Sequence, residues 1–274
     1  MLTATWYYTT LLFAAKAINT QSQTLRTEPM TESQLKAASN KVLCTVSRIQ
    51  ALTPTVQQVI LTPKAPVEFK AGQYLQIYLS DSDKRPFSIA CAPGFHFEGK
   101  LALELQIGGA VTDNYASQAL AHLSDNTEVL VQVGLGEAYW REESTKPIIL
   151  LAGGTGFSYV HSIASAIAKA NLNRSVQLYW GLRNPQALYA ADELAAWQAS
   201  NPHYQLNLVV QEPDSSWQGR TGLVHQAVLE DHADLAVYDI YIAGPFAMVG
   251  VVRDAFLAQG AKREQMYADA FAWL

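Results

Sequence analysis

The sequence predicts two domains, an antiparallel β-barrel followed by an α/β domain built on a doubly wound, five-stranded parallel sheet. Three observations lead to this fold class. Apolar residues recur at every second position from residue 41 to 140, strand-like and helix-like segments alternate after residue 146, and three glycines mark the first strand-to-helix junction of the second half. With 274 residues, the chain can give each domain its own core. We place the barrel at residues 41–143 and the α/β domain at residues 144–274.

The barrel half is predicted from an alternation with a period of two. In "KLALELQIGG" the leucines and the isoleucine share one face, while the glutamate and glutamine share the other, as in a half-buried strand. Similar segments, separated by Pro, Gly, Asp and Asn, are "VLCTVSRIQ", "VQQVILTP", "QYLQIYLS", "PFSIACA" and "EVLVQV". The segment "TDNYASQALAHL" predicts one helix with Tyr115, Ala119 and Leu123 on a single stripe. Six strands and one helix are typical of a small closed barrel.

The second half has a different rhythm. Strand-like "IILLA", "SVQLYWG", "YQLNLVVQE", "DIYIAG" and "QMYADAF" alternate with helical "FSYVHSIASAIAKA", "QALYAADELAAWQA", "GLVHQAVLED" and "PFAMVGVVRDAFLAQG". Strict alternation of strands and helices predicts right-handed βαβ units and a parallel sheet that is covered on both faces.

Residues 1–40 are expected to form a poorly ordered N-terminal extension. The apolar stretch before Lys16 has no basic segment in front of it, and it is too short and too rich in threonine for a membrane span. An upstream start codon, with Met30 as the alternative start, would account for such an extension. A weak secretion or anchor signal is the other interpretation.

Charge and cysteine content exclude several classes of function. The net charge is −5 and there is no long run of Lys or Arg, so the chain lacks the electrostatic footprint of nucleic-acid or anionic-membrane binding. Cys44 and Cys91 are the only cysteines, which excludes a disulfide framework and a four-cysteine iron–sulfur or zinc site within this chain. We expect a cytoplasmic, reducing location.

The histidines predict no metal site, because none form an H-x-x-x-H pair or neighbour a cysteine at metal-ligand spacing. We expect His161, which follows the glycine cluster by one helical turn, to pack on a helix face or lie at the surface. The histidines are His96, His122, His161, His203, His225 and His232.

The glycine cluster lies in "PIILLAGGTGFSYVHSIASAIA", where Gly153, Gly154, Thr155 and Gly156 interrupt an apolar strand just before a helix. Ligands of doubly wound folds bind at the carboxyl ends of the strands, and a helix N-terminus there offers free N–H groups and a partial positive charge. The glycines let the backbone approach a phosphate, and the threonine adds a hydroxyl donor. A tight turn that binds nothing is the alternative.

A second motif, "DKRPFSIACAP", lies in the barrel half. Arg85 supplies a fixed cation, Phe87 a flat ring and Ser88 a short hydroxyl. A planar heteroaromatic ligand that carries a phosphate would use all three. The alternative is an exposed arginine beside an ordinary barrel strand.

Together these motifs resemble the ferredoxin–NADP reductase superfamily, and within it the bacterial NAD(P)H:flavin oxidoreductases of the enteric and bioluminescence type. The resemblance runs from about Val42 to Leu274, and it is carried by "DKRPFSIA", "AGGTGFSYVHSI", "LYWGLRNPQALY", "WQGRTGLV", "YDIYIAGPFAM" and "DAFAWL". It implies reduction of free riboflavin, FMN or FAD by NADH or NADPH, through hydride transfer from nicotinamide C4 to flavin N5, with release of the reduced flavin.

The resemblance also implies roles for individual residues. Ser88 is the catalytic residue, which hydrogen-bonds near flavin N5, while Arg85 contacts the flavin phosphate or side chain and Phe87 packs on the ring system. Pro86 and Phe271 complete the predicted flavin site, with Trp273 as the alternative cover. The predicted NAD(P)H site consists of Gly153, Gly154, Thr155 and Gly156 at the diphosphate or ribose, Trp180 and Arg183 at the adenosine, and Gly244, Pro245, Phe246 and Met248 at the nicotinamide.

Two departures from the superfamily pattern are shared with the flavin reductase branch. Tyr159 stands where many members have Pro, and Ala243 where many have Cys, so no cysteine is assigned to catalysis. No segment that would clamp an adenine on the barrel is present, which implies a flavin bound loosely as a substrate.

The resemblance leaves the electron acceptor open. A flavin-dependent monooxygenase, a luciferase or ferric iron could receive electrons from the released flavin. The alternative functions are an electron-transfer reductase that retains its flavin and serves a protein partner, and a nonenzymatic redox sensor.

Overall fold

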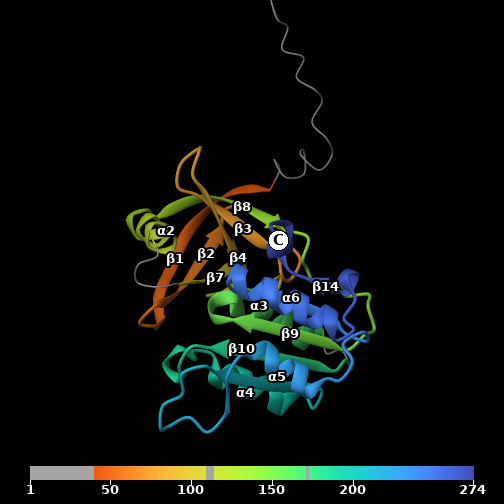
Figure 1. Ribbon diagram of the computed structural model, residues 1–274. Helices are drawn as coiled ribbons and strands as arrows, with labels where there is room; N and C mark the ends of the chain where they lie inside the picture. The colour runs from red at the N-terminus through yellow and green to blue at the C-terminus, as the bar shows by residue number, and fades with distance from the viewer. Residues whose placement is uncertain (1–39, 109–113, 171–172) are drawn as a thin grey trace, which may run out of the picture. The chain divides into compact units, whose positions relative to one another are not determined.

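The computed structural model describes residues 40–108, 114–170 and 173–274, and all of them belong to one compact unit (Figure 1). Except for Asn40, the predicted N-terminal extension lies outside the described residues. Within the described ranges, no helix is long and apolar enough to cross a membrane.

Six antiparallel strands form the first sheet, as the period-two segments predict. Their order in the sheet is β4-β3-β8-β1-β2-β7, and a short separate hairpin joins β5 to β6. The strands are β1 (Lys41–Thr53), β2 (Val56–Pro63), β3 (Tyr74–Tyr78), β4 (Lys84–Ser88), β5 (His96–Phe97), β6 (Lys100–Leu101), β7 (Leu103–Gly108) and β8 (Glu128–Leu135).

The two edges of this sheet meet just beyond β4. There the backbone N–H of Ala90 donates to the carbonyl of Glu104 on β7, at 2.7 Å. Strand β7 differs from the half-buried strand that its alternation predicts, because Glu104 and Gln106 on its polar face are only 7% and 8% exposed. That face is covered by the second half of the protein, a long-range contact that strand periodicity does not report.

The barrel helix α2 (Asn114–Asp125) has its apolar stripe in a different place from the prediction. Ala119 and Leu123 are buried as expected, but the third buried position is Ala116, while Tyr115 is 42% exposed. The spacing 116, 119 and 123 keeps the three buried side chains on one helical face, which leaves Tyr115 to point elsewhere.

The second sheet is parallel, with the order β12-β11-β10-β9-β13-β14. It confirms the predicted doubly wound class and has one strand more than predicted. The extra strand, β12 (Arg220–Thr221), is a two-residue edge strand that pairs with Val209 and Val210, and it is too short to show a periodicity. The other strands are β9 (Ile148–Gly153), β10 (Val176–Leu182), β11 (Tyr204–Val210), β13 (Asp239–Ala243) and β14 (Met266–Tyr267).

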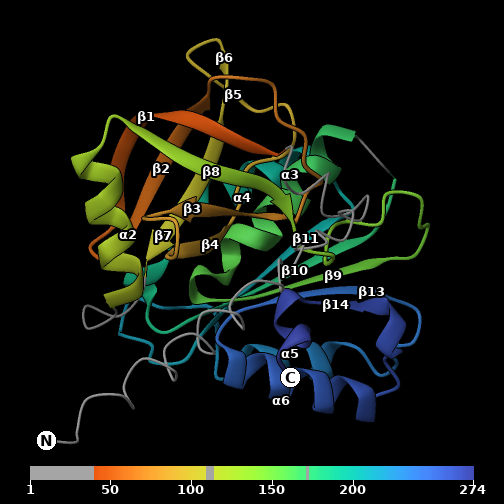
Figure 2. The same ribbon diagram turned by 90° about the horizontal axis from the view of Figure 1, so that it is seen from above.

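Helices cover both faces of the parallel sheet (Figure 2). One face packs against α3 (Phe157–Ala170) and α4 (Ala191–Ser200), and the other against α5 (Val224–Asp231) and α6 (Phe246–Ala258). Short 3₁₀ turns are η1 (Gly154–Gly156), η2 (Pro185–Ala187), η3 (Arg263–Gln265) and η4 (Asp269–Ala272).

Helix α3 is buried against both the sheet and the barrel. Its core also includes Ala71, Ala138 and Trp140, which precede the parallel sheet in the chain. The change from antiparallel to parallel pairing falls between the end of β8 and the start of β9, and the domain limits at residues 40 and 143 stay predictions.

Candidate functional site

A cavity of about 1040 Å³ lies between the barrel and the carboxyl edge of the parallel sheet. It brings together most of the predicted flavin and NAD(P)H residues, from segments that are far apart in the sequence. The predicted residues that line it are Pro86, Phe87, Ser88, Gly153, Gly154, Thr155, Gly156, Arg183, Gly244, Pro245 and Phe246. Four predicted residues, namely Arg85, Trp180, Met248 and Phe271, are not among the described residues that line it.

The glycine loop, residues 153–156, leaves β9 at the point where the chain connections diverge. Strand β9 lies between β10 and β13, and their following loops run to opposite faces, so this is the switch point of the sheet. Gly154 has φ +55°, a left-handed conformation, and a Cβ there would meet no atom within 4 Å. The backbone at Gly154 is therefore open to a ligand in the cavity.

Two predicted residues, Trp180 and Met248, pack against this loop without lining the cavity. Trp180 is fully buried, stacks on Phe157 with 3.9 Å between ring centroids, and donates its indole N–H to the Gly154 carbonyl at 2.9 Å. The Met248 side chain packs so closely that a Cβ on Gly153 or Gly244 would collide with it. Both side chains thus fix the shape of the loop, although neither reaches the cavity surface.

On the barrel side, the cavity wall consists of aromatic rings and a hydroxyl. Phe87 and Tyr115 lie with their ring centroids 5.8 Å apart, at a tilt of 47°. The hydroxyl of Ser88 has no hydrogen-bond partner among the described residues, and neither does that of Thr155 across the cavity. Sequence reasoning missed Tyr115 because its position near the helix start suggested the buried stripe.

The guanidinium of Arg85 is hydrogen-bonded to other groups of the protein. It forms a bidentate pair with Asp83, at 3.0 and 2.8 Å, and donates to the Tyr115 carbonyl at 2.7 Å and to Gln118 Oε1 at 2.6 Å. This pairing lowers the pKa of Asp83, chiefly through the hydrogen bond. The bonds to Tyr115 and Gln118 join strand β4 to helix α2, and they leave the Arg85 side chain only 12% exposed.

A buried polar network borders the cavity next to the glycine loop. Ser158 donates to the backbone carbonyl and to Oε1 of Gln106, both at 3.3 Å, and Tyr189 donates to the same Oε1 at 3.1 Å. Gln106 in turn donates to Glu104 at 3.3 Å. The network thus ties the start of α3 to β7 with every bond internal to the protein.

Asp269 supplies a carboxyl group to the cavity. It lines the cavity beside Ala270, at the start of η4. Burial raises its pKa to about 6, assisted by the charge of Glu137 and opposed by a hydrogen bond from the Ala138 N–H. Asp269 is therefore the cavity group that titrates closest to neutral pH among those with a resolved shift.

The remaining predicted residues lie at the margins. Arg183 lines the cavity rim, with its side chain 75% exposed, and pairs with Glu212 at 3.0 Å. Phe271 packs against the α6 side of the sheet and lies 4.3 Å under the Arg263 guanidinium, while Trp273 is 81% exposed.

Comparisons with known proteins agree with this architecture. Residues 150–254 match the oxidoreductase NAD-binding domain family. A solved structure, the ferredoxin reductase in carbazole 1,9a-dioxygenase, superposes with a TM-score of 0.73 at 26% identity, over 84% of this chain and 69% of the other. The protein is thus of the ferredoxin reductase class, with a barrel and an NAD-binding α/β half.

Curated relatives narrow the class. The NAD(P)H-flavin reductase of Vibrio harveyi is 44% identical over 240 residues, which cover 85% of this chain and 99% of the relative. The NAD(P)H-flavin reductase of Aliivibrio fischeri is 41% identical over 236 residues, covering 84% and 98%. The chain belongs to the NAD(P)H-flavin reductase family, which confirms the predicted resemblance.

The raised pKa of Asp269 predicts a pH-dependent stability difference. The folded protein favours the protonated form of Asp269. The wild-type free energy of unfolding should therefore fall as the pH rises from about 4 through about 6, because the carboxyl then has to ionise in a buried position. The Asp269→Asn variant does not titrate, so it should exceed wild type by up to about 3 kcal/mol at pH 8 and gain nothing at pH 4. Urea unfolding at both pH values measures this, and an equal difference at both would contradict it.

Proposed function

We propose that this protein reduces riboflavin, FMN or FAD with NADH or NADPH and releases the reduced flavin. Family membership supports the reaction class. The observation that carries the assignment of the site is the shared cavity, which faces Phe87 and Ser88 from the barrel toward the glycine loop at the switch point of the sheet. When both substrates are bound, hydride passes from nicotinamide C4 to flavin N5.

The residues on the barrel side fit a flat ring system. Phe87 and Tyr115 give an apolar wall on which a planar heteroaromatic can pack. The hydroxyl of Ser88, which lacks a partner within the described residues, is free to hydrogen-bond at the flavin N5 position. We assign Ser88 as the catalytic residue that orients and polarises this atom.

The residues on the sheet side fit a dinucleotide. The left-handed Gly154 leaves open space above the backbone, and Gly156 lies against the Ala243 carbonyl so closely that any side chain would collide. Helix α3 starts directly after the loop and directs its first N–H groups and its partial positive charge there. We assign the diphosphate to this loop and the nicotinamide to the neighbouring Gly244–Phe246 segment.

The state of Arg85 supports a flavin that exchanges with solution. Its guanidinium already bonds Asp83, Gln118 and a backbone carbonyl, so a flavin phosphate would have to replace existing charge-assisted bonds. A retained flavin that serves a protein partner is the second candidate, and it is favoured only by the likeness to a ferredoxin reductase.

We also propose how this activity fits the cell. Cys44 and Cys91 are buried and unpaired, which suits the reducing cytoplasm. Released reduced flavin would supply a flavin-dependent monooxygenase, a luciferase or ferric iron.

The Ser88→Ala variant tests the catalytic assignment. Flavin reduction in a single turnover should slow by at least about tenfold, because the hydroxyl acts on the reacting atom, while the KM for the nicotinamide substrate changes little. The matched control is Ser47→Ala, since Ser47 pairs with Thr62 on the barrel's exposed surface. A wild-type single-turnover rate in Ser88→Ala would remove Ser88 from the mechanism.

The Gly154→Ala variant tests the diphosphate assignment. The new methyl group meets no protein atom but projects into the open space, so the KM for NADH or NADPH should rise by about tenfold, or about 1.4 kcal/mol, with the KM for flavin unchanged. Gly99→Ala is the matched control, because Gly99 also has a positive φ, +76°, and open space around it. Equal kinetic effects in both variants would refute the assignment.

Purification distinguishes an exchanging flavin from a retained one. The isolated protein should be colourless, should turn over added flavin, and should show similar KM values for riboflavin and FMN because Arg85 is occupied. Visible spectroscopy after gel filtration and steady-state kinetics give the answer. A yellow chromophore that survives gel filtration would favour the electron-transfer candidate.

A further inference from the structure

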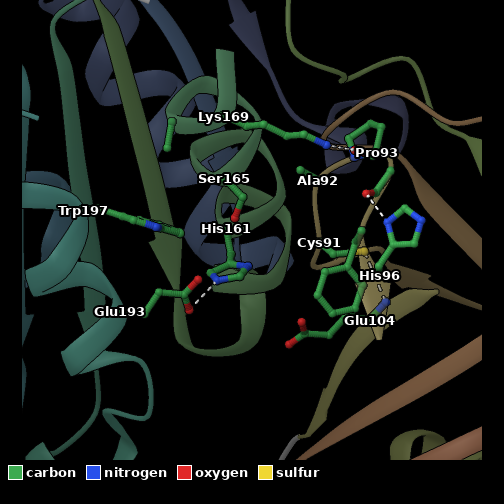
Figure 3. Close-up of a pocket in the computed structure, with 13 residues that line it drawn as sticks. Cys91, Ala92, Pro93, His96, Glu104, His161, Ser165, Lys169, Glu193 and Trp197 are labelled. Atoms are coloured by element: carbon green, nitrogen blue, oxygen red, sulfur yellow. Dashed lines mark hydrogen bonds and ion pairs between the residues drawn. The ribbon is translucent and has the colours of Figure 1, made fainter. Parts of the chain in front are cut away.

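A second cavity, of about 460 Å³, lies between α3, α4 and the segment that follows β4 (Figure 3). Among the described residues, none lines both this cavity and the larger one of about 1040 Å³, in which we place the substrates and which we call the substrate cavity. The residues on its walls come from Cys91–His96, from Glu104, from α3 and from α4. His161 of α3 and Glu193 of α4 face each other across it (Figure 3).

The His161 ring is held between two hydrogen-bond acceptors. Nδ1 lies 2.5 Å from the Ala90 carbonyl oxygen and Nε2 lies 2.9 Å from Oε2 of Glu193. A carbonyl and a carboxylate can only accept, so both bonds form only when both ring nitrogens carry hydrogen. The geometry therefore selects the imidazolium form, although the residue is only 5% exposed.

The groups around the ring account for a buried cation. Burial lowers the pKa of His161, but the hydrogen bond and charge of Glu193 on α4, together with the charge of Glu104 on β7, outweigh burial and raise the pKa above its ordinary value. His161 in turn lowers the pKa of Glu193 against the effect of burial. Lys169 of α3 and His96 of β5 line the other parts of the cavity.

The aromatic neighbours keep the ring in place. Phe157 and Trp197 each lie with their ring centroid 5.2 Å from the imidazole. The Glu193 side chain is 48% exposed, so the ion pair exchanges protons with solvent despite the burial of the imidazole.

The bond between Ala90 and His161 connects two segments that each continue into one wall of the substrate cavity. Ala90 follows Ser88 by two residues, and its own N–H closes the barrel on Glu104. Helix α3 begins at Phe157, directly after the glycine loop. One helical turn from that loop, His161 thus bonds the continuation of the strand that carries Ser88.

We propose that His161 is a positioning residue for hydride transfer, which in its doubly protonated form holds the Ser88 strand at a fixed distance from the glycine loop. This inference rests on the proposed function, because it uses the roles of Ser88 and the loop. When the ring loses a proton, the remaining N–H stays on the Glu193 carboxylate, which is the stronger acceptor. The lone pair of Nδ1 then faces the lone pairs of the Ala90 carbonyl, so the bond that links α3 to the Ser88 strand is lost. A displacement on the order of 1 Å between reacting groups slows transfer by about a hundredfold.

The sign of the pH dependence follows from the direction of the shift. The imidazolium link is present below the raised pKa of His161 and is lost as the pH increases through it. Single-turnover flavin reduction, with both substrates saturating, should therefore decline on the alkaline side. The ¹⁵N chemical shifts of the His161 ring report the same titration without any substrate.

Two substitutions separate positioning from a merely structural role. Glu193→Gln keeps an acceptor oxygen but removes the charge, so the ¹⁵N titration of His161 and the decline in rate should move together to lower pH. His161→Gln should lower the rate by about tenfold to a hundredfold, abolish the pH-dependent decline and leave both KM values nearly unchanged. The control is His96→Gln, because His96 lines the same cavity but its ring bonds, among the described residues, only the Gly94 carbonyl, at 3.0 Å. This variant should behave as wild type.

The outcomes distinguish this inference from the proposed function. A wild-type protein that does not reduce flavin overturns the proposed function itself. A protein that reduces flavin while ¹⁵N shifts report a neutral His161 at pH 6, or in which Glu193→Gln leaves the decline in rate unmoved, overturns the positioning role. If His161→Gln fails to fold, as judged by circular dichroism, the Glu193→Gln shift alone decides.

Discussion

The packing of α3 against the barrel is the constraint on which the rest of the structure depends. Along its first two turns, Ser158, Tyr159, His161 and Ser162 are all buried, and each hydrogen-bonds a carbonyl of the barrel half. A buried polar group without a hydrogen-bond partner costs free energy of folding. A shift of helix α3 by even one residue would leave four such groups without their partners. The barrel and the parallel sheet are therefore locked in one register.

This register determines how the walls of the larger cavity are placed. Helix α3 carries the glycine loop at its start, while the barrel segments that it grips continue the strand of Phe87 and Ser88. The sheet contributes the glycine loop, whose Gly154 carbonyl is held by the indole N–H of Trp180. The barrel contributes the aromatic wall of Phe87 and Tyr115. In the proposed site, each half would supply a surface for one substrate, and α3 would set the distance between the two surfaces, on which hydride transfer depends.

The sequence predicted the features that depend on local residue patterns, and it missed the contacts between residues far apart in the chain. Periods of two and 3.6 predicted the barrel strands and the parallel sheet, and the motifs predicted most of the cavity lining. Nothing local reveals that Trp180 stacks on Phe157, or that Arg85 bonds Gln118 and a backbone carbonyl of α2, because those contacts form only in the fold. Tyr159, which the sequence marked only as a departure, donates to the Ala138 carbonyl at 2.5 Å and belongs to the α3 contact.

The proposed exchange of flavin with solution would make this internal rigidity necessary. An enzyme that keeps its cofactor can use the cofactor's own contacts to hold two domains together, whereas here Arg85 is committed to the protein itself. The geometry must then exist before either substrate arrives, since each binding event otherwise has to supply the ordering free energy. Charged and hydrogen-bonded links such as His161 with Glu193 and Arg85 with Asp83 provide that order on both sides of the cavity.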